Sequence, residues 1–183
     1  VLDGGDDEDF ANLDMTGETR DLQYRAAVPG SDTKVGDVIL RNVEYVRLTG
    51  GSGNDDFEGH HARDELHGGA GNDRLRGVAG NTLFGDDGDD TLHVVGQGIM
   101  DGGTGVDLGI VDLSGTSTGI DWQFNRYADI QTLGEIAIIG IERLDIRAGS
   151  GADRLFGTSL ADRFDGGDGN DMLIGLQGDD ILT

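Results

Sequence analysis

The sequence contains no cysteine, a single proline and few aromatic side chains, and each shortage narrows the kinds of protein it can encode. Without cysteine no disulfide bond can form, so the fold must be held together in another way. Basic residues are also scarce: 13 Lys and Arg stand against 36 Asp and Glu, a formal net charge of −23. A chain this acidic repels nucleic acid and anionic membranes, so we expect neither as a partner.

Long apolar runs are missing as well. The longest lies near Ile136 and Ile141, far short of the roughly 20 residues that cross a bilayer, so no membrane span is expected. Low hydrophobicity with high net charge is typical of disordered chains. The same composition suits a chain that is disordered without metal and folds when a cation binds.

Glycine is abundant, with 34 residues, and much of it falls in a nine-residue pattern. The stretch 50–76 reads GGSGNDDFE, GHHARDELH, GGAGNDRLR, three units without a linker. A period this short is typical of a solenoid. Each unit has an Asp at its sixth place and an apolar residue at its eighth: Asp55 and Phe57, Asp64 and Leu66, Asp73 and Leu75.

The chemistry of one unit predicts its structure. Six residues ending in Asp form a glycine-rich turn, and the next three form a short strand whose middle side chain points inward. Two units complete one coil, so equivalent turns stack every 18 residues at about 4.8 Å, and Asp55 lies beside Asp73. Stacked carboxylates repel one another and need a cation, and oxygen ligands without His or Cys favour calcium.

The units divide the chain into four parts. Residues 1–49 hold a degenerate turn and a strand-rich stretch, 50–110 a first block of repeats, 111–147 a second strand-rich stretch, and 148–183 a second block. In the first block the sixth place is taken by Asp55, Asp64, Asp73, Asn81, Asp90 and Asp107. In the second it is taken by Asp153, Asp162, Asp171 and Asp180, with Leu155, Phe164, Leu173 and Leu182 inward.

A longer duplication relates the two strand-rich stretches. VEYVRLTGGSGND at 43–55 aligns with IERLDIRAGSGAD at 141–153, an offset of 98 that holds elsewhere apart from a two-residue slip near Gln23 and Gln123. The alternation of apolar residues predicts strands. Because the second stretch is close to two coils long, we expect wider, calcium-free coils that carry the sheet onward.

These GGxGxDxUx units resemble the repeats-in-toxin (RTX) family, the haemolysin-type calcium-binding repeats of secreted bacterial proteins. The resemblance implies an all-β fold, a right-handed parallel β-roll with two related β modules inserted. It also implies secretion by the type I route and folding in extracellular or cell-surface calcium. We expect a monomeric fragment of a larger secreted protein.

The resemblance implies that each calcium ion is held between two turns on the same side, by the Asp carboxylates and by backbone carbonyls of the glycine positions. The expected glycines are Gly51, Gly53, Gly69, Gly71, Gly88, Gly103, Gly105, Gly149, Gly151, Gly167, Gly169 and Gly178. About five or six ions are expected, at the pairs Asp55–Asp73, Asp73–Asp90, Asp90–Asp107, Asp153–Asp171 and Asp162–Asp180, with a weak or empty place between Asp64 and Asn81.

Other interpretations fit less well. An EF-hand beginning at Asp87 would need Gly where Leu92 stands and Glu where Gly98 stands. The four His residues lack a zinc motif, and no Ser or Thr has a recognisable triad. Trp122 and Phe124 are expected as core or capping residues of the second stretch, with sugar stacking as the alternative.

Two functions remain. The preferred one is a structural calcium-binding module, not an enzyme, from an adhesin, surface-layer protein or toxin. The alternative is the accessory segment of a secreted protease, lipase or alginate epimerase whose catalytic domain lies outside these residues.

Overall fold

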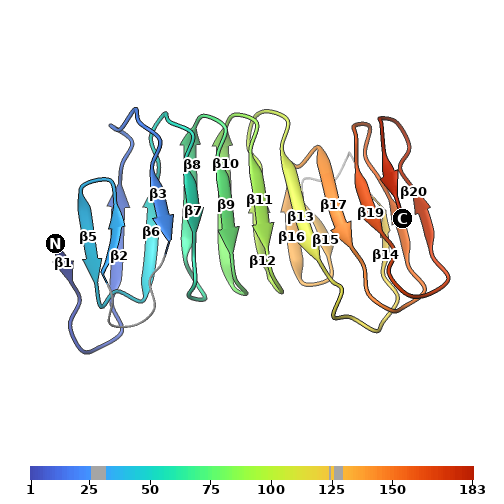
Figure 1. The fold of residues 1–183 in the computed structure, drawn as a ribbon, viewed down its shortest axis with the longest axis horizontal. Coiled ribbons are helices and arrows are strands. Elements are labelled where there is room, and N and C mark those ends of the chain that lie inside the picture. The colour runs from blue at the N-terminus through green and yellow to red at the C-terminus, as the bar shows by residue number, and fades with distance from the viewer. Residues whose placement is uncertain (26–31, 124, 126–129) are drawn as a thin grey trace.

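The computed structural model describes residues 1–25, 32–123, 125 and 130–183. Within these residues the chain is all β-structure, with no helix, and the strands follow one another along the long axis of the molecule (Figure 1). Almost all strand pairs are parallel. The all-β, mostly parallel architecture is the one expected for a β-roll. No helix of the described part is long and apolar enough to cross a membrane.

Two long sheets face each other across a thin core. The eight-stranded sheet consists, in chain order, of β3 (Gln23–Arg25), β7 (Asp56–Glu58), β9 (Arg74–Gly77), β11 (Thr91–Val94), β13 (Leu108–Asp112), β17 (Arg143–Arg147), β19 (Arg163–Asp165) and β21 (Ile181–Leu182). The seven-stranded sheet consists of β2 (Phe10–Asp14), β6 (Tyr45–Thr49), β8 (Glu65–Ala70), β10 (Asn81–Asp87), β12 (Gly98–Asp101), β15 (Gln131–Leu133) and β16 (Ile136–Ile139).

Two small sheets complete the described part. One contains β1 (Leu2–Asp3), β4 (Thr33–Val35) and β5 (Val38–Arg41). The other contains β14 (Asp121–Gln123), β18 (Arg154–Phe156) and β20 (Met172–Ile174). After residue 143 successive strands alternate between the eight-stranded sheet and this last one.

The strands of the repeat units are short because each contributes one inward side chain. Phe57, Leu66, Leu75, Leu83 and Leu92 are fully buried, while their strand neighbours lie outward. Parallel pairing sets each of them against the equivalent residue one coil away, such as Phe57 against Leu75. The predicted coil of two units is therefore confirmed in the first block.

The second block buries Leu155 and Phe164 in the same way, but its last coil is more open. Leu173 is half-buried and Leu182 is 41% exposed, although Leu182 pairs with the buried Phe164 as the inward pattern predicts. The reason for this exposure is its place in β21, the edge strand of the eight-stranded sheet, which has a neighbour on one side alone.

The duplication is present in three dimensions, without the predicted slip. Tyr24 pairs with Phe57 and Trp122 with Leu155, each pair displaced by 98 residues from the other. Antiparallel pairing of Thr33 with Leu40 likewise recurs as Gln131 with Ile138. The register is fixed by the buried aromatic residue of each short strand, Tyr24 or Trp122, and not by the two glutamines.

Residues 111–147 extend the stack, but not as two further parallel coils. The eight-stranded sheet continues directly from β13 to β17, which pairs Leu108 with Arg143. On the other wall β15 turns back and pairs antiparallel with β16, which ends the seven-stranded sheet. From there on, the small sheet of β14, β18 and β20 forms the second wall of the roll. The sheets thus continue through one wider coil, which pairs Gly98 with Ile136 and Leu108 with Arg143, and the expectation of two coils is corrected by the antiparallel β15–β16 hairpin.

Candidate metal site

The acidic residues of the first block form one continuous row, as the 18-residue spacing predicts. Asp55, Asp73, Asp90 and Asp107 each stand immediately or almost immediately before a strand of the eight-stranded sheet. The N–H of Asp55 donates to Oδ1 of Asp73 at 2.7 Å, that of Asp73 to Oδ1 of Asp90 at 2.7 Å, and that of Asp90 to Oδ1 of Asp107 at 2.8 Å. One carboxylate oxygen of each residue therefore ties its coil to the preceding one.

The same bond links the acids of the second block. The N–H of Asp153 donates to Oδ1 of Asp171 and that of Asp162 to Oδ1 of Asp180, both at 2.9 Å. Thus every stacked pair expected from the repeat is found side by side. Whether the pairs bind a metal is a separate question, which depends on the second oxygen of each carboxylate.

In four of these residues the second oxygen is buried and has no hydrogen-bond partner among the described residues. They are Asp73, Asp90, Asp107 and Asp153, each at most 3% exposed, and in each the lone oxygen is Oδ2. A buried carboxylate oxygen without a partner carries a large desolvation cost. A cation at this place would offset that cost, so the donor chemistry fits a hard divalent ion.

Glycine at the first place of each unit leaves room for this arrangement. A Cβ on Gly68 would run into Oδ2 of Asp73 and lie 2.8 Å from the carbonyl oxygen of Gly85. A Cβ on Gly85 would meet Oδ2 of Asp90 and the carbonyl oxygen of Gly102 in the same way. The carboxylate oxygen of one coil and the carbonyl oxygen of the next thus converge where a side chain would begin. Both are oxygen ligands of the type that calcium takes.

The predicted glycines stack on one another along the roll. A Cβ on Gly69 or Gly71 would collide with the carbonyl oxygen of Gly51 or Gly53, one coil earlier. Several of them adopt positive φ, such as 103° at Gly69 and 143° at Gly169, which a residue with a Cβ rarely adopts. Equivalent backbone-on-backbone contacts involve Gly88, Gly103, Gly105, Gly149, Gly151, Gly167, Gly169 and Gly178.

Burying several carboxylates in one row disfavours their ionisation and raises their pKa values. Burial raises the pKa of Asp73 to about 7, and the carboxylates of Asp90 and Asp55 add to the rise. Burial likewise raises the pKa of Asp90 and of Asp107 to about 6. A group that resists ionisation near neutral pH lacks a compensating positive charge. The row as it stands is therefore short of cations.

The opposite edge differs in the way its second oxygens are used. Asp64 is stacked on Asn81, whose Oδ1 accepts the N–H of Asp64 at 3.2 Å. Oδ2 of Asp64 accepts the N–H of His61 at 3.2 Å, within its own turn. Burial raises the pKa of Asp64, and the backbone N–H bond at Val46 counteracts this. This edge thus has fewer charges and fewer free oxygens, as the replacement by Asn81 predicts.

Asp162 resembles Asp64 rather than Asp73, which the repeat pattern alone does not show. Its Oδ2 accepts from the backbone N–H of Thr158 at 2.6 Å and from the Thr158 hydroxyl at 3.0 Å. The 98-residue offset places Asp162 at the position of Asp64, so both units of this type satisfy their own carboxylate. An ion at the Asp162–Asp180 pair would have to displace Thr158 to reach that oxygen.

Two glutamates extend the rows of acids and were missed by the repeat pattern: Glu142 precedes a strand of the eight-stranded sheet, and Glu44 one of the seven-stranded sheet. Oε2 of Glu142 accepts the N–H of Asp107 at 3.0 Å, and Oε2 of Glu44 accepts that of Asp9 at 2.9 Å. They stand 98 residues apart, so the duplication is the signal that could have identified them. Each replaces Asp where the coil is longer, since the extra methylene extends the carboxylate's reach.

The histidines lie outside these rows, as expected. His67 stacks on Phe84 with ring centroids 4.3 Å apart and lies 2.9 Å from Glu65. Among the described residues no three His, Cys, Asp or Glu side chains converge as a metal site. A metal here must therefore draw on backbone carbonyls as well as carboxylates. Trp122 is buried, as predicted for a core residue, whereas Phe124 lies outside the described residues.

Comparison with known protein families agrees with this geometry. The model of the RTX calcium-binding nonapeptide repeat (4 copies) matches residues 49–83, 81–94 and 147–182. These parts of the chain belong to the RTX repeat family, whose repeats bind calcium and are typical of secreted bacterial proteins. No curated protein and no solved structure matches the chain.

Proposed function

We propose that this chain is a calcium-dependent folding module of a secreted bacterial RTX protein: a right-handed β-roll, with inserted β modules at 1–49 and 111–147, that is completed by extracellular calcium. The observation that carries the proposal is the set of five buried Asp Oδ2 atoms without a hydrogen-bond partner in the described structure, in Asp9, Asp73, Asp90, Asp107 and Asp153. They recur at one position of the repeat, in a chain of net charge −23.

The residues that would hold the ions are those that meet at the first glycine of each unit. Asp73, Asp90, Asp107 and Asp153 supply the free carboxylate oxygens, and the glycine positions supply backbone carbonyls. Bound calcium would supply the positive charge that the row lacks. Because the ligands come from successive coils, each ion would add a link between two coils that strand pairing and the Oδ1 hydrogen bonds already join.

The stacked pairs would bind calcium unequally. We place the stronger sites at the pairs Asp55–Asp73, Asp73–Asp90, Asp90–Asp107 and Asp153–Asp171. The pairs Asp64–Asn81 and Asp162–Asp180 would be weaker, because Oδ2 of Asp64 and of Asp162 is bonded within its own turn and neither pair contains a buried carboxylate oxygen without a described partner. Oδ2 of Asp55 is also bonded in its own turn, to the N–H of Gly51 at 3.3 Å, but its pair includes the free Oδ2 of Asp73. The total expected from the repeats stays at about five or six ions when the weak places fill.

We also propose that the chain is structural and not itself an enzyme, within an adhesin, surface-layer protein or toxin. The arrangement of its buried carboxylates supports this: they stand in periodic rows whose Oδ1 atoms hold neighbouring coils together. A pair of catalytic carboxylates would instead face one another across a cleft.

Calcium titration calorimetry tests the proposal. We expect one class of high-affinity sites in the row from Asp55 to Asp107 and at Asp153, and a second class of weaker sites. A chain that binds no calcium at millimolar concentration, or that binds it with one uniform affinity unaffected by substitution of the rows, would contradict it.

A further inference from the structure

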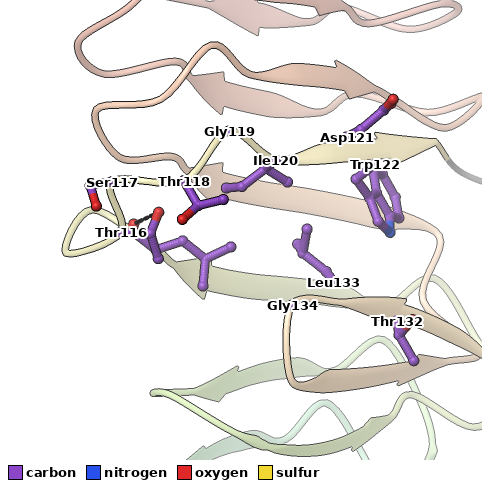
Figure 2. A pocket seen from close by; sticks show the side chains of 11 residues that line it. Thr116, Ser117, Thr118, Gly119, Ile120, Asp121, Trp122, Thr132, Leu133 and Gly134 are labelled. Atoms are coloured by element: carbon purple, nitrogen blue, oxygen red, sulfur yellow. Dashed lines mark hydrogen bonds between the residues drawn. The ribbon is translucent and has the colours of Figure 1, made fainter.

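A cavity opens in the wall of the roll where the seven-stranded sheet ends and β14 begins. Its volume is about 510 Å³. Figure 2 shows Trp122 of β14 and Leu133 of β15 projecting into the space between the two strands, with the threonines of the preceding loop at one side. The floor is apolar, the rim carries hydroxyls, and none of the described residues that line it is Lys or Arg.

The same place exists in the first half of the chain, 98 residues earlier. A shallower depression there is lined by Arg20, Asp21, Leu22, Gln23, Lys34 and Gly36. Adding 98 to each number gives Thr118, Gly119, Ile120, Asp121, Thr132 and Gly134, all of which line the cavity. The two pockets are therefore duplicates, and their differences show what the second one lacks.

In the first copy an arginine side chain lines the depression and lies over its turn. Nη2 of Arg20 lies 3.2 Å from Oδ2 of Asp37, and its Nε lies 3.1 Å from Glu18. A Cβ built on Gly36 would be 3.4 Å from Nη2 of Arg20 and 3.5 Å from Cδ2 of Leu22. The guanidinium therefore lies over the turn that joins β4 and β5 and is held there by two carboxylates.

The second copy has the same turn, but it has threonine at the two positions where the first copy has Arg20 and Lys34. Gly134 repeats the left-handed conformation of Gly36, with φ of 61° against 54°, but a Cβ there would have no described atom within 4 Å. Thr118 stands for Arg20 and Thr132 for Lys34. Glu135 stands for Asp37 and retains the negative charge, and Asp121 adds a carboxylate where the first copy has Gln23.

We propose that this cavity binds an arginine side chain of a partner peptide, which takes the place over the turn that Arg20 occupies in the first copy. Ile120, Trp122 and Leu133 would contact the aliphatic part of the side chain, and Glu135 would pair with the guanidinium as Asp37 does. Arginine rather than lysine is expected, because the planar guanidinium can pair with a carboxylate and bond hydroxyls at once.

Trp122 is the chain's single tryptophan and lines the cavity, so its fluorescence reports occupancy directly. The calcium-loaded chain is titrated with the peptide Ac-Gly-Arg-Gly-NH2, and with matched peptides that carry lysine or citrulline. We expect a saturable change with the arginine peptide, several-fold weaker binding of lysine and at least tenfold weaker binding of citrulline, which has the shape of arginine without its charge. Circular dichroism of the same samples confirms that the roll is folded.

Two variants locate the site. Thr118→Arg supplies the side chain in cis and should weaken peptide binding at least tenfold, whereas Thr19→Arg adds the same charge at an exposed residue that lines neither pocket and should leave it unchanged. Glu135→Gln should weaken binding several-fold without changing the fold. Arg20→Thr should enlarge the first pocket and raise the calorimetric stoichiometry from one peptide to two.

The proposal is overturned if the arginine peptide gives no saturable change at millimolar concentration. Equal binding of the citrulline peptide would also overturn it, since the cavity would then select for shape or hydroxyls alone. Binding that Thr118→Arg and Glu135→Gln both leave intact would place the peptide elsewhere on the acidic surface and refute this site.

Discussion

The backbone N–H of Asp55 donates a 2.7 Å hydrogen bond to Oδ1 of Asp73, one coil further along the roll. This bond gives the repeated Asp two separate roles. Oδ1 holds neighbouring coils together whether or not a metal is present, whereas in Asp73, Asp90, Asp107 and Asp153 Oδ2 is left buried without a described partner and is free for an ion. The two roles can be separated by substitution.

Asp73→Asn should reduce calcium binding while keeping the bond between coils. The side-chain amide retains an oxygen that can accept the N–H of Asp55, as Asn81 accepts that of Asp64. We expect loss of about two tight sites in calcium calorimetry, because Asp73 belongs to two stacked pairs, and Asp73→Ala should additionally lower the stability by about 1–3 kcal/mol.

The matched control is Asp64→Asn on the opposite edge. Oδ2 of Asp64 is already bonded within its own turn, so this substitution should cost at most one weak site. Equal losses of bound calcium in the two variants would refute the unequal edges.

Gly68→Ala should destabilise the roll strongly although alanine is small. Its Cβ would occupy the place where Oδ2 of Asp73 and the carbonyl oxygen of Gly85 converge. We expect a loss of about 1–3 kcal/mol in thermal or denaturant unfolding with calcium present. Gly115→Ala is the control, because a Cβ there meets no described atom within 4 Å. Similar stabilities of the two variants would contradict the close approach of coils at Gly68.

Acidification should favour folding of the calcium-stripped chain. The pKa values of Asp73, Asp90 and Asp107 are raised to about 6–7 in the fold, whereas an unfolded Asp titrates near about 3.9. Between these values the folded chain binds more protons, so its stability falls as pH rises. We expect more β-structure at pH 5 than at pH 7.5 by circular dichroism.

The calcium-loaded chain should respond in the opposite sense, since protons compete with the ion for the same oxygens. Calcium affinity should therefore fall from pH 7.5 to pH 5. A metal-free chain whose β-content rises with pH would show that these carboxylates do not govern its stability.

Magnesium should not replace calcium. The ligands that converge in each turn are carboxylate and carbonyl oxygens on separate coils, which suit the long, irregular coordination of calcium. Magnesium requires a tight octahedron and retains its water. We expect a folding midpoint at least tenfold higher in magnesium; equal midpoints for the two ions would argue against ligands drawn from successive coils.

The nine-residue period was sufficient to predict the stacked pairs, such as Asp73 with Asp90, and the inward residues, such as Leu75, because each follows from a turn and a strand of fixed length. It did not predict that Thr158 would satisfy Asp162, since that depends on one hydroxyl at a variable place. Nor did it predict the β15–β16 hairpin, whose antiparallel pairing is set by the Gly134 turn rather than by the repeat. Glu142 and Glu44 could be identified as members of the rows from the 98-residue duplication, but not from the nine-residue period.

Circular dichroism with and without a calcium chelator tests the central claim most directly. The charge of −23 and the thin core leave little to oppose a chain entropy of about 1–2 kcal/mol per residue. Five sites at ten times their Kd would add on the order of 7 kcal/mol to the folded state. We predict a largely unfolded spectrum in chelator and a cooperative appearance of β-structure as calcium is added. An unchanged β spectrum in excess chelator would contradict the account.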